Sequence, residues 1–174
     1  MKYRCILADP PWSFLTYSKK QTTPHRCAED HYKTMTHGEL QALPVEQWAE
    51  KDCALFMWIV GSHIDVGINL AKCWGFQFKT DAFVWSKGKI GMGYWTRKQT
   101  ETCYLFTKGK PARLCKGVRQ LITAPRREHS RKPDEQYERI ESLVLGPYLE
   151  MFARQRRPGW DVWGNETDKF TEAA

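Results

Sequence analysis

The residues best suited to chemistry lie near the amino terminus, in the stretch RCILADPPWSF. A short apolar run ends at Asp9, and Pro10, Pro11 and Trp12 follow it directly. Proline has no backbone N–H, so this segment presents carbonyl acceptors beside a carboxylate. A planar amine needs such partners, and the proline and tryptophan rings can cover its flat face. The alternative is a rigid turn at the end of a strand, with Asp9 as a cap.

Composition limits the class of protein. The chain has 174 residues, of which 41% are hydrophobic and 13% aromatic, which favours one folded domain over a disordered chain. Its formal net charge of +7 favours a polyanionic partner such as nucleic acid. A basic domain without such a partner has the same composition.

The cysteines and the apolar runs narrow the setting. The six cysteines never form a C-x-x-C pair, so we expect free thiols and no metal site. No apolar run approaches the roughly 18 residues that span a bilayer. We expect a cytoplasmic protein without membrane partners.

The order of elements predicts a single doubly wound α/β domain with a mostly parallel sheet. Strands are expected over residues 3–8, 53–60, 76–87, 101–109, 148–154 and 161–165. Thr36 to Glu39 fits a capping box that opens a short helix, and Ser62 can cap a second helix with Ile64 on its core face. A third helix is expected to begin near Pro133. Loops are predicted over residues 13–35 and 87–99.

Asp9-Pro10-Pro11-Trp12 resembles the DPPW signature of S-adenosylmethionine-dependent adenine methyltransferases. The similar family is that of the mRNA adenosine methyltransferase catalytic subunit and its prokaryotic and phage relatives. Further segments match in the family's order: HYKTM (31–35), LFMWIVG (55–61), WGF (74–76), VWSK (84–87), REHSRKPDEQYERIE (127–141), LEMFAR (149–154) and WDVWGNE (160–166). The resemblance implies a Rossmann-like methyltransferase domain over residues 1–167, with a permuted motif order, and a polar tail over residues 168–174.

The activity implied by the resemblance is methylation of the 6-amino group of adenine in nucleic acid. The lone pair of this nitrogen is delocalised into the ring, so an enzyme must hold it in line with the methyl group. By resemblance, the Asp9 carboxylate and the Pro10 carbonyl accept hydrogen bonds from the amino group, and Pro11 and Trp12 shape the pocket. Hydrogen bonds that strengthen as the nitrogen attacks stabilise the transition state.

The resemblance also implies a set of contacts with S-adenosylmethionine. They come from Asp9, Lys132, Arg154, Asn165 and Glu166. Lys132 approaches the cofactor carboxylate, Asn165 lies near its ribose and amino-acid part, and Glu166 can accept ribose hydroxyls. The family's glycine after Phe152 is Ala153 here, which alters how closely the backbone can approach the cofactor. Outside the motif, Lys132 would be an ordinary solvated cation and Arg154 a surface residue.

Substrate contacts are expected from cationic and aromatic residues around the catalytic segment. The predicted residues are Tyr32, Lys19, Lys20, Arg97, Arg127 and Arg131. The cations would contact phosphates and position a strand without reading its sequence. Tyr32 can close over the base or the cofactor, or can simply pack. Each charge cluster can also be a solvated face.

Partners remain open at this level. Brevity, and likeness to the stand-alone prokaryotic and phage relatives, favour DNA over RNA as substrate. With little room for a target-recognition module, the chain can act as a homodimer or with a partner subunit. The alternative function is a non-catalytic nucleic-acid-binding subunit that supports an active methyltransferase.

Overall fold

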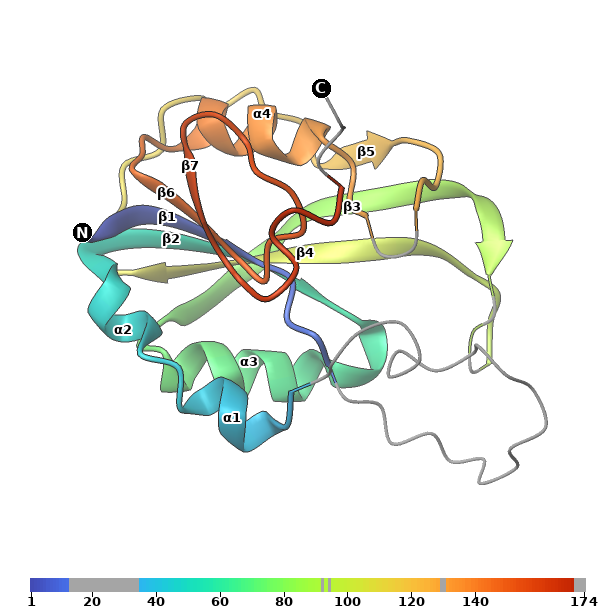
Figure 1. The fold of residues 1–174 in the computed structure, drawn as a ribbon. Helices are drawn as coiled ribbons and strands as arrows, with labels where there is room; N and C mark the ends of the chain where they lie inside the picture. Colours follow the sequence, from blue (N-terminus) through green and yellow to red (C-terminus); the bar gives the residue numbers. More distant parts are fainter. Residues whose placement is uncertain (13–34, 92, 94, 129–130, 171–174) are drawn as a thin grey trace.

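The structure is a computed structural model that describes residues 1–12, 35–91, 93, 95–128 and 131–170. Within these ranges the chain forms one seven-stranded sheet with helices on both faces (Figure 1). The strands are β1 (Tyr3–Ala8), β2 (Ala49–Ile59), β3 (Gln77–Gly91), β4 (Lys98–Lys108), β5 (Leu121–Thr123), β6 (Tyr148–Met151) and β7 (Trp160–Trp163). The helices are α1 (His37–Gln41), α2 (Val45–Trp48), α3 (Ile64–Cys73) and α4 (Glu135–Leu143).

The sheet is mostly parallel, as predicted. Its strand order is β5-β3-β4-β2-β1-β6-β7, and β4 alone of the described strands runs against its neighbours. The ends of β1, β2, β3, β6 and β7 therefore lie at one edge of the sheet, together with the start of β4. We call this the carboxyl edge. Ligands of open α/β sheets bind at such an edge.

Two apolar cores cover the two faces of the sheet, because successive strand side chains point to opposite faces. In β2, one alternate set packs under α1, α2 and α3, and the other packs under α4. The first set is Cys53, Leu55, Met57 and Ile59, and the second is Ala54, Phe56 and Trp58. Burying one such large side chain contributes about 1.5–3 kcal/mol. Both faces of the central strands are thus fixed by packing.

The predicted capping box at α1 is confirmed. The Thr36 hydroxyl accepts a hydrogen bond from the Glu39 N–H at 3.3 Å, and Glu39 Oε2 accepts one from the Thr36 N–H at 2.8 Å. This reciprocal pair satisfies two donors at the helix start. The helix ends at Gln41, three residues before Pro44.

The predicted start of α3 is wrong. Ser62 lies in a 3-10 turn, and its hydroxyl contacts His63 Nδ1 at 2.9 Å instead of capping the helix. Ile64 is 37% exposed, so it does not belong to the core face. Gly67 is one residue of this helix that faces the sheet. A side chain at this position would collide with Ile59.

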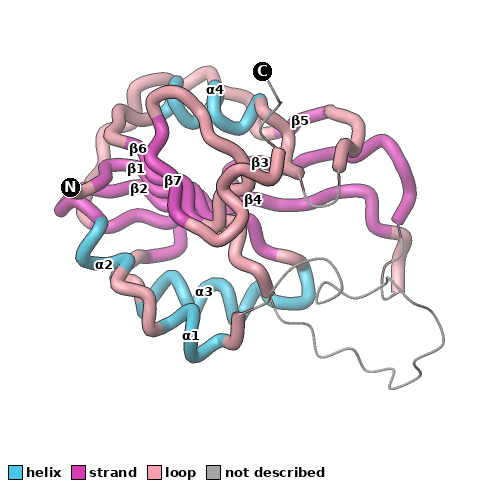
Figure 2. The backbone as a smooth tube through the Cα atoms, viewed as in Figure 1, coloured by secondary structure: helices cyan, strands magenta, loops and turns pink. Residues whose placement is uncertain are grey.

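The loop predicted over residues 87–99 is shorter than expected. β3 continues to Gly91 and β4 begins at Lys98, with Ser86 opposite Thr100 and Gly91 opposite Lys98. Pairing between the two strands continues beyond the apolar residues from which their ends were predicted. Both strands are therefore longer than expected at this end. The resulting hairpin extends beyond the rest of the sheet (Figure 2).

Some predictions lie outside the described residues. These are the loop over residues 13–34 and the substrate contacts from Lys19, Lys20 and Tyr32. The sequence analysis missed two short elements, α2 and β5, because neither has enough residues to show a period. In the part of the chain that is described, no helix combines the length and the apolar character needed to cross a bilayer.

Candidate active site

The DPPW segment turns sharply where it leaves the sheet. Asp9 follows β1 directly, so it emerges at the carboxyl edge. The Pro10 carbonyl accepts a hydrogen bond from the Trp12 N–H at 2.8 Å, and the Pro11 carbonyl accepts one from the Met35 N–H at 3.1 Å. A carbonyl oxygen has two lone pairs, so Pro10 can accept a second hydrogen bond. The turn therefore offers two hydrogen-bond acceptors from consecutive residues, the Asp9 carboxylate and the Pro10 carbonyl.

Trp12 lies in the core below this turn. Its side chain is 5% exposed, packs with the residues under α1 and α3, and lies 5.9 Å from the His63 ring between centroids. The indole therefore anchors the turn and does not lie over it. Trp12 can therefore shape a pocket indirectly, by holding Pro10 and Pro11 in position.

A chain of ion pairs joins the interior of the sheet to Asp9. Lys132 Nζ lies 2.7 Å from Asp9 Oδ2 and 3.4 Å from Glu101 Oε2, and Glu101 Oε1 lies 2.8 Å from Lys87 Nζ. Lys132 precedes α4, Glu101 lies in β4 and Lys87 lies in β3. The Lys132 ammonium also lies 5.6 Å from the centre of the Trp58 ring, within reach of a cation–π interaction.

These partners keep the buried charges ionised. Burial would raise the pKa of Glu101, but Lys132 and Lys87 outweigh it and lower this pKa to about 2. Burial would lower the pKa of Lys132, but Asp9 and Glu101 outweigh it and raise this pKa above its usual range. At Lys98, burial lowers the pKa; Lys87 and Lys132 add to this effect, and Glu101 opposes it.

Asp9 and Lys132 line a cleft at the carboxyl edge. Its other walls come from β1, β2, α4, β6 and the segment after β6, and include Leu7, Trp58, Tyr137, Glu150, Phe152 and Arg154. A second hollow shares Phe152 and Arg154 with this cleft, and is also lined by Pro11, Asn165 and Glu166. Of the predicted catalytic residues, Asp9 and Pro11 thus line these adjoining hollows and Pro10 and Trp12 do not. The predicted cofactor residues all line one or both of them.

The predicted cofactor residues after β6 are tied to the C-terminal segment. Arg154 Nε lies 3.6 Å from Glu166 Oε2, and Lys169 Nζ lies 2.7 Å from Glu166 Oε1. The Arg154 carbonyl accepts a hydrogen bond from the Phe170 N–H at 2.9 Å. Asn165 is exposed at the second hollow. Residues 168–170, the first of the predicted tail, therefore pack against the site.

The backbone changes direction where β6 ends. Phe152 has φ +61°, in the left-handed region, so the strand stops at Met151 and does not reach Arg154 as predicted. The Ala153 N–H donates to the Trp163 carbonyl at 3.1 Å. Gly164 has φ +156°, and a Cβ there would lie 3.1 Å from Ala153 N. This close approach shapes the wall that both hollows share.

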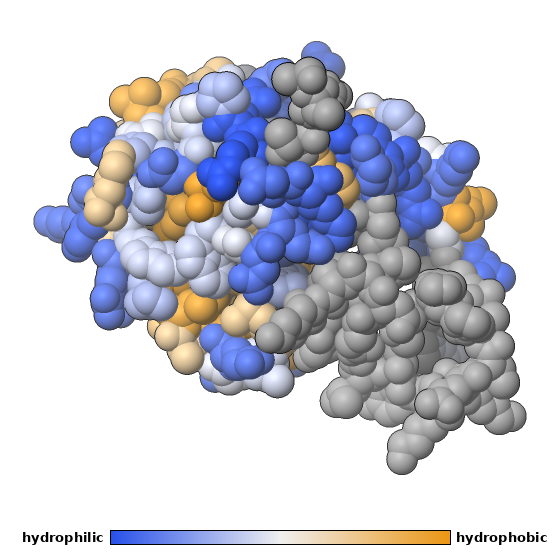
Figure 3. Space-filling model, viewed as in Figure 1, coloured by the Kyte–Doolittle hydropathy of each residue, from blue (hydrophilic) through white to orange (hydrophobic). Residues whose placement is uncertain are grey.

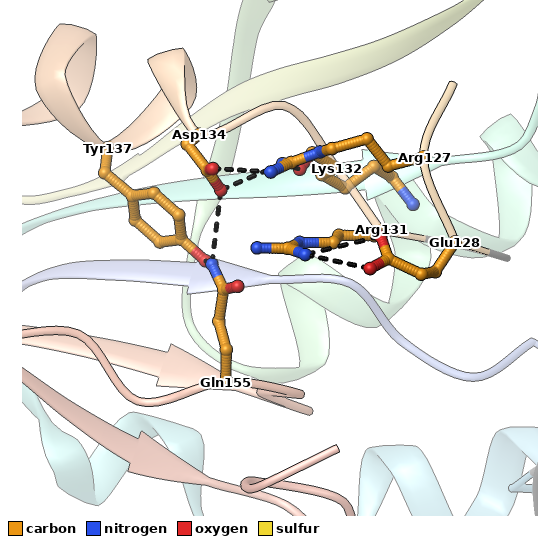
Figure 4. A network of polar contacts seen from close by, with 7 residues as sticks. All are labelled: Arg127, Glu128, Arg131, Lys132, Asp134, Tyr137 and Gln155. Carbon is orange, nitrogen blue, oxygen red and sulfur yellow. Dashed lines mark hydrogen bonds and ion pairs between the residues drawn. The ribbon is translucent and has the colours of Figure 1, made fainter. Parts of the chain in front are cut away.

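The two arginines predicted to contact substrate near Lys132 are bound within the chain (Figure 4). Arg127 Nη1 and Nη2 donate to the Asp134 carboxylate at 2.6 and 2.9 Å, and Nη2 also donates to the Lys132 carbonyl at 2.7 Å. Arg131 Nη1 lies 3.1 Å from Glu128 Oε1, and its guanidinium lies 5.4 Å from the Phe170 ring centre. Their predicted phosphate contacts stay predictions.

Arg97 lies apart from these residues, beside the tip of the β3–β4 hairpin. It is exposed, as are its neighbours Trp95 and Thr96. Trp95 is 90% exposed, which is exceptional for so large an apolar ring. From residue 82 to residue 100 the chain has four cations and no carboxylate.

The sequence analysis missed polar residues that support the site from β4, α4, β6 and the segment after β6. Besides Glu101, these are Tyr137, Glu150 and Gln155. The Tyr137 hydroxyl lies 3.0 Å from both Glu150 oxygens and accepts from Gln155 Nε2 at 3.2 Å. A single acid in an otherwise apolar strand, as in YLEM, was the available signal for Glu150.

Glu150 stands out electrostatically. Burial raises its pKa to about 7, against the hydrogen bonds from Tyr137 and with the charges of Asp9 and Asp134 adding to the effect. Burial likewise raises the pKa of Tyr137, with Glu150 as the next cause. The Tyr137 hydroxyl therefore stays protonated and donates a hydrogen bond to the Glu150 carboxyl group.

Comparison with known proteins gives a consistent result. The sequence pattern of the MT-A70 family matches residues 3–166. The type II methyltransferase M.MunI of a Mycoplasma species is 37% identical over 181 residues, which cover 95% of this chain and 78% of the relative. The human N(6)-adenosine-methyltransferase catalytic subunit METTL3 is 30% identical over 179 residues, and the Drosophila melanogaster MT-A70-like protein is 32% identical over 179 residues. Each alignment covers 96% of this chain, but only 28% and 27% of those two relatives.

Proposed function

We propose, because the chain belongs to the MT-A70 family, that it methylates the 6-amino group of adenine in nucleic acid with S-adenosylmethionine as the methyl donor. The observation that carries the proposal is the Asp9 carboxylate at the carboxyl edge. It borders a cleft, directly precedes a rigid proline turn, and has one oxygen held by Lys132 at 2.7 Å. An adenine amino group has two N–H donors, which match the remaining Asp9 oxygen and the Pro10 carbonyl.

The chain's own residues orient the nitrogen. The Asp9 and Pro10 acceptors hold both N–H groups, so the lone pair faces away from them and toward the methyl donor. As the N–C bond forms, positive charge grows on the nitrogen and these hydrogen bonds strengthen, which favours the transition state. One N–H proton is then lost to Asp9 or to water. No side chain needs to form a covalent bond with the substrate.

The donor set fits S-adenosylmethionine. Bound there, the cofactor supplies a methyl group on a positively charged sulfur. The described residues take two of the three Lys132 donors, so the third can bind a carboxylate. Asn165 can donate to and accept from ribose hydroxyls, and Glu166 can accept from them. Arg154 borders both hollows and can contact either end of the cofactor.

DNA is the polymer that we favour. The chain spans most of the Mycoplasma type II methyltransferase, but little more than a quarter of the animal N(6)-adenosine-methyltransferases. In a duplex, the adenine would have to leave the stack to reach Asp9, at a cost of a few kcal/mol. A single strand avoids most of that cost. Assembly as a homodimer or with a partner subunit stays a prediction.

The β3–β4 hairpin is the surface best suited to hold the strand. Lys89 and Arg97 can pair with phosphates, and the exposed Trp95 ring can stack on a base. On the face shown in Figure 3, the surface near the described part of this hairpin is mostly hydrophilic, with an apolar patch at its outer edge. Stacking of one base on an aromatic ring is worth about 1–3 kcal/mol, so a single exposed tryptophan can contribute substantially.

The test is methyl transfer from labelled S-adenosylmethionine to matched single-stranded DNA, duplex DNA and RNA, followed by nucleoside digestion. We expect 6-methyladenine, with the rate falling about 100-fold in Asp9→Asn because one transition-state acceptor loses its charge. Asp65→Asn, in the exposed first turn of α3, is the matched control and should retain activity. Full activity of Asp9→Asn would contradict the proposed mechanism. Absence of both methyl transfer and cofactor binding would contradict the function.

A further inference from the structure

Arg127 is bound more tightly within the chain than a phosphate-contacting arginine would be. Its guanidinium makes three short hydrogen bonds, two to the Asp134 carboxylate and one to the Lys132 carbonyl, at 2.6 to 2.9 Å. Paired arginine and carboxylate groups of this geometry are strong and directional. The charge of Arg127 is thus already neutralised by Asp134, and a phosphate would have to compete with that pair.

Asp134 is diverted from its usual local role. It is the residue before α4, where an aspartate commonly accepts a hydrogen bond from the first turn of the helix, yet its side chain makes no such bond. Its carboxylate binds Arg127 instead, and it also accepts from Gln155 Nε2 at 3.3 Å. The backbone of Asp134 is helical, with φ −67° and ψ −22°, so its carboxylate is available for these partners.

The network continues from Asp134 to the sheet, as Figure 4 shows. Gln155 Nε2 also donates to the Tyr137 hydroxyl at 3.2 Å, and Tyr137 donates to Glu150 in β6. Arg127 therefore ties the backbone at Lys132 to α4 and, through Gln155, to the segment that follows β6. The Lys132 side chain crosses from this anchored position to Asp9 at the end of β1.

We propose that Arg127 is a positioning residue, which fixes the backbone of Lys132 so that its ammonium group reaches Asp9 and Glu101. The predicted phosphate contact at Arg127 would then be replaced by a structural bond within the site. Lysine cannot reproduce this arrangement, because a single ammonium group lacks the planar fork that binds two carboxylate oxygens and a carbonyl at once. The expected effect on S-adenosylmethionine binding rests on the proposed function. The proposed positioning of Lys132 does not depend on that function.

The experiment compares Arg127→Lys with Arg126→Lys. Arg126 is the exposed neighbour, and the described residues make no side-chain hydrogen bond with it. Lys132 is 10% exposed and ion-paired, so it should react slowly with an amine-acylating reagent. Peptide mass spectrometry would measure its acylation relative to the exposed Lys72. Thermal unfolding of each variant would show that the fold is kept.

We expect Arg127→Lys to increase Lys132 acylation several-fold and to weaken S-adenosylmethionine binding about tenfold, the range set by losing a charged hydrogen bond. The dependence of nucleic-acid affinity on salt should not change. Arg126→Lys should leave all three measurements as in the wild type. Increased acylation with unchanged cofactor affinity would support the positioning role and contradict the proposed cofactor role of Lys132. Unchanged acylation would overturn the inference, as would a salt slope smaller in magnitude by about one in Arg127→Gln, which unlike Arg127→Lys removes the charge.

Discussion

At the scale of single residues, the site depends on balanced charge. The ion pairs run in the order Lys87, Glu101, Lys132 and Asp9, so that cations and anions alternate. These four residues lie at a partly buried edge of the sheet. Breaking a buried pair by removing one partner is costly, because it leaves an unpaired charge. Each member therefore holds the next one in place, and Asp9 receives its position from residues as remote in sequence as β3.

Glu150 gives a prediction about pH. Its pKa is about 7 in the folded chain, above the usual value near 4.5, so the folded state binds this proton more tightly than the unfolded state. The contribution of Glu150 to stability is therefore full below about pH 4.5 and declines as the pH rises through 7. A shift of this size corresponds to roughly 3 kcal/mol.

Glu150→Gln removes this titration and keeps an acceptor for the Tyr137 hydroxyl. We expect the free energy of unfolding of the variant, minus that of the wild type, to increase between pH 5 and pH 8. Urea unfolding without ligand at several pH values measures this difference, and titrations shared by both proteins cancel. A difference that stays constant over this range would contradict a raised pKa at Glu150.

The segment proposed to be catalytic could be singled out from the sequence because its chemistry is local. Asp9, Pro10 and Pro11 are consecutive, and their meaning requires no knowledge of the rest of the fold. Glu101 was not predictable, because its place beside Lys132 depends on β4 running against β2, with Trp58 opposite Cys103. Arg127 was identified as a residue of interest, but its hydrogen bonds with Asp134 and the Lys132 carbonyl could be seen only in the structure.

At the scale of elements, the backbone is tightly constrained at the end of β6. Gly164 approaches the backbone of Phe152 and Ala153 so closely that a Cβ would lie 3.1 Å from each. Gly164→Ala should therefore displace the wall shared by the two hollows. We expect weaker S-adenosylmethionine binding in calorimetry and a loss of stability of about 1–3 kcal/mol.

Gly159→Ala is the matched control for this change. Gly159 also has a positive φ, +82°, but a Cβ there has no described atom within 4 Å. It should cost about 1–2 kcal/mol of stability from backbone strain alone and leave cofactor affinity unchanged. Equal losses of affinity in both variants would show that general destabilisation, and not the position of Phe152, controls binding.

Element boundaries were less predictable than element types. The strands, the capping box and the helix after Pro133 followed from local patterns, and the structure contains each of them. The ends of β3, β4 and β6 did not, because pairing extends the first two and the left-handed Phe152 stops the third. Ile64 was misplaced because Gly67, which carries no apolar signal, faces the sheet.

At the scale of the whole molecule, positive charge is spread unevenly. The arginines around Lys132 are paired with Asp134 and Glu128, whereas Lys89 and Arg97 of the hairpin have no ion pair among the described residues. These two cations of the hairpin are thus available to nucleic acid, unlike Arg127 and Arg131. Composition alone could indicate a polyanion partner, but it could not show which cations are already used by the fold.

The last prediction separates charge from stacking at this hairpin. Arg97→Ala should reduce the magnitude of the slope of log affinity against log salt by about 0.9 for duplex DNA or 0.7 for a single strand. Trp95→Ala should weaken binding about tenfold at every salt concentration and leave this slope unchanged, because stacking releases no counterions. Fluorescence anisotropy with short oligonucleotides measures both effects. Arg113→Ala is the control, since Arg113 is exposed beyond β4 at the opposite edge of the sheet. If Arg97→Ala and Arg113→Ala change the salt slope alike and Trp95→Ala does not change binding, nucleic acid contacts the protein through its net charge and not through the hairpin.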